Sequence, residues 1–184
     1  MKKRSELLSK FQRKYKHHIN KGLSFHHIES IREMADFDFD VYLETKGKNL
    51  QREFCWNQQQ KESLIFSILR DQKINPIVVV QVKDRNYNID SNYLFKVIDG
   101  KQRLTTVFDF IDGKFPIEIE NKQYFFKDLP EDCQKQIRWY NFTWDVHYHY
   151  DDEPITDDTL IDLFEDCNFL GTPQDKNHLN YLKQ

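Results

Sequence analysis

The stretch from Tyr93 to Ile111 constrains the fold more than any other part of this sequence. Residues 93–98 read YLFKVI, a run of apolar, aromatic and β-branched side chains that is typical of a buried strand. Asp99 and Gly100 end this run. The apolar residues beyond them have the spacing of one helix face, namely Leu104, Val107, Phe108 and Ile111. The sequence therefore predicts a strand, a sharp turn and a helix in direct succession.

The same periodicities predict the remaining elements. We expect strands over 37–43, 76–82, 115–120, 123–126 and 142–150. We expect helices over 57–69, 129–139 and 156–167, with Asn57 as the cap of the first, and a short helix after Gly171-Thr172-Pro173. Residues 83–92 form a polar loop in this interpretation. Strands and helices in such an irregular order predict an α+β fold, a mixed sheet with flanking helices.

The composition predicts one folded domain preceded by a basic segment. Charged residues make up 31% of the 184 residues, but 15 Phe, 9 Tyr and 3 Trp supply enough apolar surface for a core. The first segment is rich in Lys and Arg and places Leu7, Leu8, Phe11 and Tyr15 at helical spacing. We therefore expect a basic amphipathic helix over 1–22 and the folded domain over 23–184. The basic helix is either a solvated face or an arm that binds nucleic acid.

Several classes of protein are disfavoured by the sequence. The longest apolar run, near 77–80, is far shorter than the roughly 20 residues that a membrane helix requires. The basic start of the chain is not followed by the apolar stretch of a secretory signal, so we expect a cytoplasmic protein without membrane contact. The cysteines Cys55, Cys133 and Cys167 are widely spaced without a C-x-x-C pair, and we interpret them as reduced packing residues.

The turn between the predicted strand and helix has the composition of an anion site. The first backbone N–H groups of a helix lack intrahelical partners and lie at the positive end of its dipole. Gly100 would let a phosphate approach closely, Lys101 and Arg103 add positive charge, and Asp99 and Gln102 are suited to hold a metal, a water or a ribose hydroxyl. Basic residues at a helix N-terminus cost about 0.3–1 kcal/mol unless an anion compensates. The alternative is a plain turn in which Arg103 pairs internally with Asp99.

Several separated motifs carry a resemblance to a known family. They are NLQREFCW at 49–56, QKESLIFSIL at 60–69, IDGKQRLTT at 98–106 and LFEDCNFLGTP at 163–173. In order and spacing they resemble the ParB/sulfiredoxin-like domains with a DGQQR motif, the N-terminal halves of GmrSD-type restriction and phage-defence proteins. The resemblance covers roughly residues 35 to 183. It implies a ParB/sulfiredoxin-like fold.

The resemblance also implies a nucleoside triphosphate site, with hydrolysis coupled in restriction members to cleavage of DNA. Asp99, Gly100, Gln102 and Arg103 match the motif position by position, as does Arg52 after Gln51. Two positions depart from the pattern. Lys101 replaces the usual Gln, and Asp166 stands where many members have an Arg. The 184 residues also leave no room for a C-terminal HNH nuclease domain, so we expect any cutting activity to come from a separate partner or to be absent.

The predicted site therefore assigns catalysis to Asp99, Arg103 and Arg52, with Mg²⁺ held at Asp99. Phosphate or substrate binding is assigned to Gly100, Lys101, Gln102, Gln51 and Asn168, although an end-of-helix cap is an equal alternative for Asn168. Trp56 and Phe54 are interpreted as core residues rather than base-stacking ones. His147 and His149 share a strand face, but no spacing supplies further metal ligands beside them.

Three functional hypotheses follow from the sequence. The first is an NTPase or nuclease-associated hydrolase that uses the turn at 99–103. The second is a regulatory module that binds a nucleotide or DNA without turnover and acts with a separate nuclease or other protein. The third is DNA binding through the basic N-terminal helix, which predicts a steep dependence of affinity on salt.

Overall fold

The described residues of this computed structural model, 19–82, 93–149 and 155–169, form a five-stranded mixed sheet. Its strands, in spatial order, are β1 (Ile19–His27), β9 (Asn141–His149), β5 (Ile77–Val82), β6 (Tyr93–Asp99) and β2 (Ala35–Asp38). The β1–β9 and β5–β6 pairs are antiparallel, whereas β5–β9 and β2–β6 are parallel. The predicted α+β class with a mixed sheet is therefore confirmed.

Helices cover both faces of this sheet. One cluster of buried side chains joins the sheet to α2 (Ile28–Met34), α3 (Gln58–Leu69), α4 (Lys101–Ile111) and α5 (Glu131–Arg138). A second cluster lies under α6 (Asp157–Phe169) and the hairpin of β3 (Tyr42–Leu43) and β4 (Lys48–Asn49). Strand β5 is apolar on both sides because Ile77 and Val79 enter the first cluster while Val78 and Val80 enter the second.

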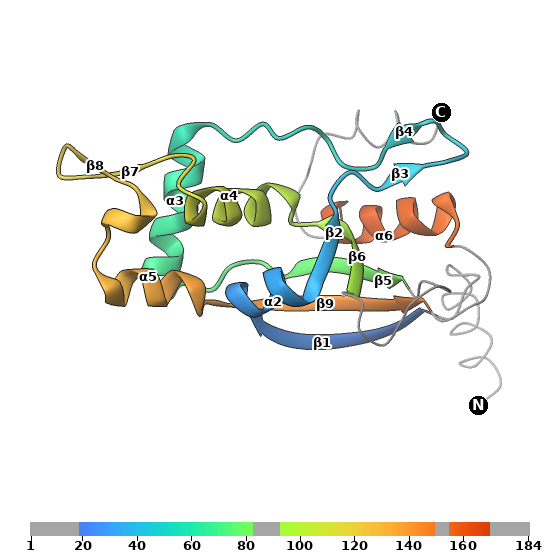
Figure 1. Cartoon of the computed structure of the whole chain (residues 1–184). Coiled ribbons are helices and arrows are strands. Elements are labelled where there is room, and N and C mark those ends of the chain that lie inside the picture. Colours follow the sequence, from blue (N-terminus) through green and yellow to red (C-terminus); the bar gives the residue numbers. More distant parts are fainter. Residues whose placement is uncertain (1–18, 83–92, 150–154, 170–184) are drawn as a thin grey trace.

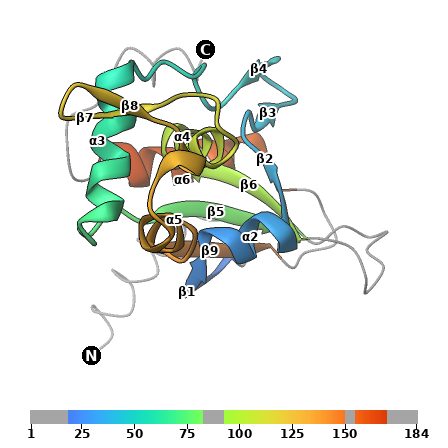
Figure 2. The same ribbon diagram turned by 60° about the vertical axis from the view of Figure 1, so that its left-hand side comes forward.

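The views in Figures 1 and 2 place α3 and the β3–β4 hairpin at opposite sides of the molecule. The chain between them, residues 50–57, crosses over α4 on its way to α3. A second hairpin, β7 (Ile117–Ile119) and β8 (Lys122–Tyr124), and the 3₁₀ turn η1 (Phe126–Asp128) follow α4. The C-terminal end of α6 faces the N-terminal end of α4. Three separate parts of the chain thus meet at the start of α4.

Most of the elements expected from periodicity are present within one to three residues of their expected bounds. Asn57 caps α3 through a capping box with Gln60, as its position predicted. The β7–β8 hairpin turns at Glu120 and Asn121, both with positive φ. The predicted loop over 83–92 and the C-terminal helix after Gly171 lie outside the described residues.

Two expectations near the N-terminus differ from the structure. Residues 19–22 belong to strand β1 and not to a helix, and residues 1–18 of the expected basic helix lie outside the described part. The strand expected over 37–43 ends at Asp38 instead. The carboxylate of Asp38 accepts hydrogen bonds from the backbone N–H groups of Asp40 and Val41, at 3.2 and 2.8 Å, and this local turn interrupts the strand. Val41 there adopts a φ of 51°.

No helix within 19–82, 93–149 or 155–169 has the length and apolar character needed to cross a bilayer.

Candidate functional site

A cavity of about 750 Å³ lies where the turn from β6 into α4, the segment 50–57 and the end of α6 meet. It is lined by every residue that the sequence analysis assigned to the site: Gln51, Arg52, Asp99, Gly100, Lys101, Gln102, Arg103 and Asn168. Three further residues line it, namely Trp56, Asn75 and Phe164. The fold therefore gathers into one cavity residues that are far apart in the sequence.

Gly100 is required at the turn for a reason that the sequence did not reveal. It caps α4 with a φ of 116° and a ψ of 2°, a conformation that side chains rarely adopt. A Cβ at this position would lie 2.5 Å from Cδ1 of Ile77 on the neighbouring strand. The missing side chain thus makes room for the core. Gly100 also lines the cavity, and the close approach of a phosphate expected from the sequence stays a prediction.

The guanidinium of Arg103 donates hydrogen bonds to three oxygen atoms beside the turn from β6 into α4. Its Nη2 donates to Oδ2 of Asp99 at 2.6 Å, and its Nη1 donates to the backbone oxygen atoms of Asn75 and Pro76, the latter at 3.1 Å. The side chain is 12% exposed. The internal pairing weighed as an alternative is therefore present. The cavity nevertheless opens beside it, so this guanidinium is both fixed in position and in contact with the cavity.

Lys101 also has an internal partner. Its Nζ lies 2.6 Å from Oδ1 of Asp40, and the lysine side chain is 9% exposed while that of Asp40 is 60% exposed. Asp40 comes from the turn after β2, so this ion pair connects the start of α4 to the edge of the sheet. The first turn of α4 carries no acidic residue. Among the described residues, Asp99 and Asp40 are the carboxylates paired with these two basic side chains at the positive helix end.

The two glutamines of the site bind protein backbone. Gln102 accepts a hydrogen bond from the backbone N–H of Cys55 at 2.9 Å and donates to the backbone oxygen of Glu53 at 3.1 Å. Gln51 donates to the backbone oxygen atoms of Val97, at 3.2 Å, and Ile98. Both side chains therefore fasten the segment 50–57 onto β6 and α4. The contact of Gln102 with a metal, a water or a ribose hydroxyl, expected from the sequence, stays a prediction beside these backbone bonds.

Arg52 lies on this fastened segment and differs from the other two cations. It is exposed, and among the described residues its guanidinium forms no ion pair or hydrogen bond. The backbone on either side of it is held through Gln51 and Gln102. Arg52 is therefore a positioned cation whose hydrogen-bonding capacity is available to a ligand.

The wall contributed by α6 is less polar. Asn168 is buried and donates from Nδ2 to the backbone oxygen of Phe164 one turn earlier, at 2.8 Å. This bond lies within the helix and differs from the helix-end cap considered for it. Trp56 packs partly against the main core and partly lines the cavity. Phe54, expected in the core, is 36% exposed.

Sequence reasoning missed Asn75 and Phe164 on the cavity wall and Asp40 as the partner of Lys101. Asn75 and Asp40 are distant in sequence from α4. The backbone oxygen of Asn75 binds Arg103, and the carboxylate of Asp40 binds Lys101. The sequence predicts the helix that contains Phe164, but helical spacing does not indicate which end of the sheet this side chain faces. Pairings of this kind carry no local signal.

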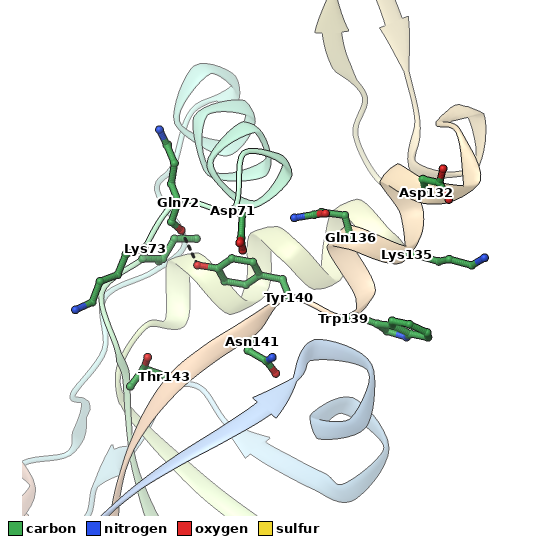
Figure 3. A pocket seen from close by; sticks show the side chains of 11 residues that line it. Asp71, Gln72, Lys73, Asp132, Lys135, Gln136, Trp139, Tyr140, Asn141 and Thr143 are labelled. Carbon is green, nitrogen blue, oxygen red and sulfur yellow. Dashed lines mark hydrogen bonds between the residues drawn. The ribbon is translucent and has the colours of Figure 1, made fainter.

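A second cavity, of about 460 Å³, lies between the connection that follows α3, helix α5 and the start of β9. Figure 3 shows the Tyr140 hydroxyl already bound to the backbone oxygen of Gln72, at 2.7 Å, while the side chains of Lys73 and Lys135 point away from the centre. It contains none of the residues that the sequence assigned to a site. We therefore assign the functional site to the first cavity.

The described residues include no group of three or more His, Cys, Asp or Glu side chains that is arranged to hold a metal ion. His147 lies 3.4 Å from a carboxylate oxygen of Asp145. Cys133 and Cys167 are half-buried and form no disulfide, whereas Cys55 is exposed, contrary to its expected packing role. Asp99 is the one carboxylate on the described wall of the cavity.

An α+β domain with a basic strand–turn–helix cavity is thus the class that the fold and the site define. The chain matches the family described as "GmrSD restriction endonuclease, N-terminal domain" over residues 47–180, and it belongs to that family. This membership links the protein to restriction and phage-defence systems. The matched range contains every residue assigned to the site.

One curated relative is also similar to part of the chain. A stretch of 99 residues is 30% identical to the uncharacterized protein MJ0686 of Methanocaldococcus jannaschii. The match covers 44% of this chain and 17% of the relative, so the chain corresponds to a small part of that longer protein. No solved structure is significantly similar to the chain.

Proposed function

We propose that the cavity at the start of α4 binds the phosphates of a nucleoside triphosphate. One observation carries this proposal: Arg52 and Arg103 line the same cavity as the first turn of α4, and Arg52 has no partner among the described residues. Paired guanidinium groups with helix N–H donors are a common way of holding phosphate oxygens. The ParB/sulfiredoxin-like fold and the DGQQR motif, in which Lys101 replaces Gln, are part of the same proposal.

The charges on the cavity wall support this proposal. Arg52, Lys101 and Arg103 supply three positive charges, and Asp99 supplies the one negative charge of the described lining. The ion pairs of Lys101 and Arg103 reduce their net field but hold the two side chains in place before a ligand arrives. Such pre-organisation lowers the entropic cost of binding.

Mg²⁺ is compatible with this donor set. Mg²⁺ that accompanies a nucleotide is usually held by one or two carboxylates together with phosphate oxygens and water. Asp99 is 33% exposed and lines the cavity, so it would supply that carboxylate. The ion would neutralise phosphate charge there, while Arg52 and Arg103 would stabilise the charge of the transferring phosphoryl group.

A second function, nucleotide binding without turnover, is favoured by a separate observation. Asp99 is the one carboxylate on the described wall, and its Oδ2 is bound to Arg103. A general base must be available to accept a proton from the attacking water, and this carboxylate is partly engaged. The module would then act as a nucleotide or DNA sensor with a separate HNH-type nuclease or other partner.

Calorimetric titration of the whole chain with a non-hydrolysable NTP and Mg²⁺ tests binding. Removing a charge-assisted bond costs about 1.5–3 kcal/mol, so we expect Arg52→Ala and Arg103→Ala each to weaken binding by about 10- to 150-fold. Arg138→Ala, on α5 and outside the cavity, is the control for lost positive charge. Equal affinities of Arg52→Ala, Arg138→Ala and the wild type would contradict the site.

The same protein, supplied with hydrolysable NTPs and Mg²⁺, separates the two functions. Release of phosphate or diphosphate that is lost in Arg52→Ala supports an NTPase. Tight binding without any release supports the sensor.

A further inference from the structure

Trp56 differs from the other large aromatic side chains of the cavity region. It lines the cavity and is partly exposed, whereas Phe164 on the facing helix is 5% exposed. Among the described residues, the indole of Trp56 forms no stacking contact with another ring and no hydrogen bond. One part of it packs on the core and the remainder faces the cavity.

The position of Trp56 is fixed together with that of Arg52. Both residues lie on the segment 50–57, and the amide of Gln102 binds the backbone at Glu53 and Cys55 between them. Asn57, the next residue, caps α3. The indole and the guanidinium are therefore presented to the same cavity from one fastened stretch of chain.

We infer that Trp56 is the platform on which the base of the nucleotide stacks. This inference rests on the proposed phosphate site, to which it adds the part of the ligand that inorganic phosphates lack. Aromatic side chains beside a cationic groove bind bases through their π-faces, with little preference among bases. Arg52 and Arg103 hold the charged end of the ligand and Trp56 holds its flat, apolar end.

The arrangement makes a prediction about ligand class. A site of cations alone would bind inorganic triphosphate at least as well as a nucleoside triphosphate, because inorganic triphosphate has the same three phosphates and one more ionisable oxygen. A stacking platform adds about 1–3 kcal/mol per base, which is about 5- to 150-fold in affinity. The cavity is therefore selective for nucleotides of any base over inorganic triphosphate.

Titrations with a non-hydrolysable NTP and with inorganic tripolyphosphate test this inference, both with Mg²⁺. Trp56→Leu keeps apolar packing against the core but lacks an aromatic face, and Trp56→Phe retains a smaller one. We expect Trp56→Leu to lower NTP affinity by about 5- to 150-fold and to leave tripolyphosphate affinity unchanged, with Trp56→Phe in between. Trp139→Phe is the matched control, because Trp139 is 59% exposed and lines the other cavity.

Tryptophan emission provides a second measurement on the same proteins. We expect an added NTP to quench emission in the wild type and in Trp139→Phe, and the quenching to disappear in Trp56→Phe. Thermal unfolding of each variant checks that it is folded.

The outcomes distinguish the inference from the proposed function. Equal affinity of the wild type for NTP and tripolyphosphate, with no effect of Trp56→Leu, would overturn the stacking platform and leave the phosphate site standing. Failure of both ligands to bind the wild type would overturn both. A loss of affinity in Trp56→Leu that is equal for the two ligands would show that Trp56 only supports the structure, and would also overturn the platform.

Discussion

At the scale of single residues, the site depends on side chains that bind the protein's own backbone. Gln102 binds the backbone of residues 53 and 55 with both ends of its amide, and Gln51 donates from its amide nitrogen to two backbone oxygen atoms of β6. An amide is suited to this task because one end accepts while the other donates. The side chain of Arg52 is exposed, while the backbone on either side of it is held by these hydrogen bonds.

Gln102→Ala tests whether Gln102 acts through Arg52. Removing the amide takes away two hydrogen bonds to the segment 50–57, at about 0.5–1.5 kcal/mol each, so we expect modestly lower stability and weaker nucleotide binding. Urea unfolding measures the first effect and calorimetric titration the second.

The double variant Arg52→Ala/Gln102→Ala is the critical comparison. If Gln102 only positions Arg52, the second substitution adds little to the loss of binding caused by the first, since coupled residues are not additive. Fully additive losses would show that Gln102 contacts the ligand itself.

Tyr140 gives a residue-scale prediction away from the site. Burial raises the pKa of its hydroxyl, which donates to the backbone oxygen of Gln72 at 2.7 Å. A raised folded pKa means that the unfolded chain loses this proton first. The associated stability is therefore complete below the unfolded pKa, near 10, and is lost as pH rises through the folded pKa.

Tyr140→Phe removes both the hydrogen bond and the titration. We expect the variant to be less stable near neutral pH, by about 0.5–1.5 kcal/mol. As pH rises above 10, the difference in stability between the two proteins should shrink. Only the wild type has a buried phenol whose ionisation favours the unfolded chain. Urea unfolding of both proteins between pH 7 and about 11 measures this difference. A gap that stays constant over that range would contradict the assignment.

At the scale of elements, the turn from β6 into α4 fixes the position of the site relative to the hydrophobic core. Gly100 provides the left-handed backbone, and the space beside it is filled by Ile77 of β5. The site is thus built on a strand junction that the hydrophobic core itself specifies.

Gly100→Ala and Gly113→Ala separate the two requirements at such a turn. Both glycines have positive φ, at 116° and 72°, but a Cβ at Gly113 would meet nothing within 4 Å. The left-handed backbone alone costs about 1–2 kcal/mol, which we expect for Gly113→Ala. We expect Gly100→Ala to cost about 1–3 kcal/mol more because of overpacking against Ile77.

Chemical denaturation measures both free energies of unfolding. Equal losses in the two variants would show that Ile77 moves aside without cost, and would remove the packing argument for Gly100.

The elements that could be predicted are those whose periodicity is local. The change from an apolar run at 93–98 to helical spacing after Gly100 located β6, the turn and α4, and the cap at Asn57 located α3. Strand β1 was missed because its sequence, INKGLSFHH, lacks alternation and its pairing depends on β9, more than 100 residues away. The strand end at Asp38 was missed because the carboxylate of that residue forms a turn with Val41.

The residues of the candidate site were found largely through motifs, and their individual roles were not. Grouping of Arg52, Asp99 and Arg103 followed from the family resemblance, and the structure places them on one cavity. The backbone contacts of Gln102, the Ile77 contact of Gly100 and the Asp40 partner of Lys101 each join distant segments. Only the folded chain defines such pairs.

At the scale of the whole molecule, the cavity lies where the layers on the two faces of the sheet meet. The start of α4 belongs to the first hydrophobic cluster, while Phe164 of α6 belongs to the second. The segment 50–57 crosses between the β3–β4 hairpin and α3. A ligand in the cavity would therefore contact both layers and the chain that joins them.

This position predicts that ligand binding stabilises the entire domain. A ligand that binds only the folded state adds about 2.7 kcal/mol at a concentration of 100 Kd, so we expect a clear rise in the melting temperature with a non-hydrolysable NTP and Mg²⁺. Hydrogen exchange should slow at the start of α4 and at the end of α6 together, because the ligand bridges them. Arg52→Ala, which loses an exposed contact and no described internal partner, should melt near the wild-type temperature without ligand and gain less with it. Protection confined to α4, with none at α6, would show that the ligand contacts one layer only and that α6 is not part of the site.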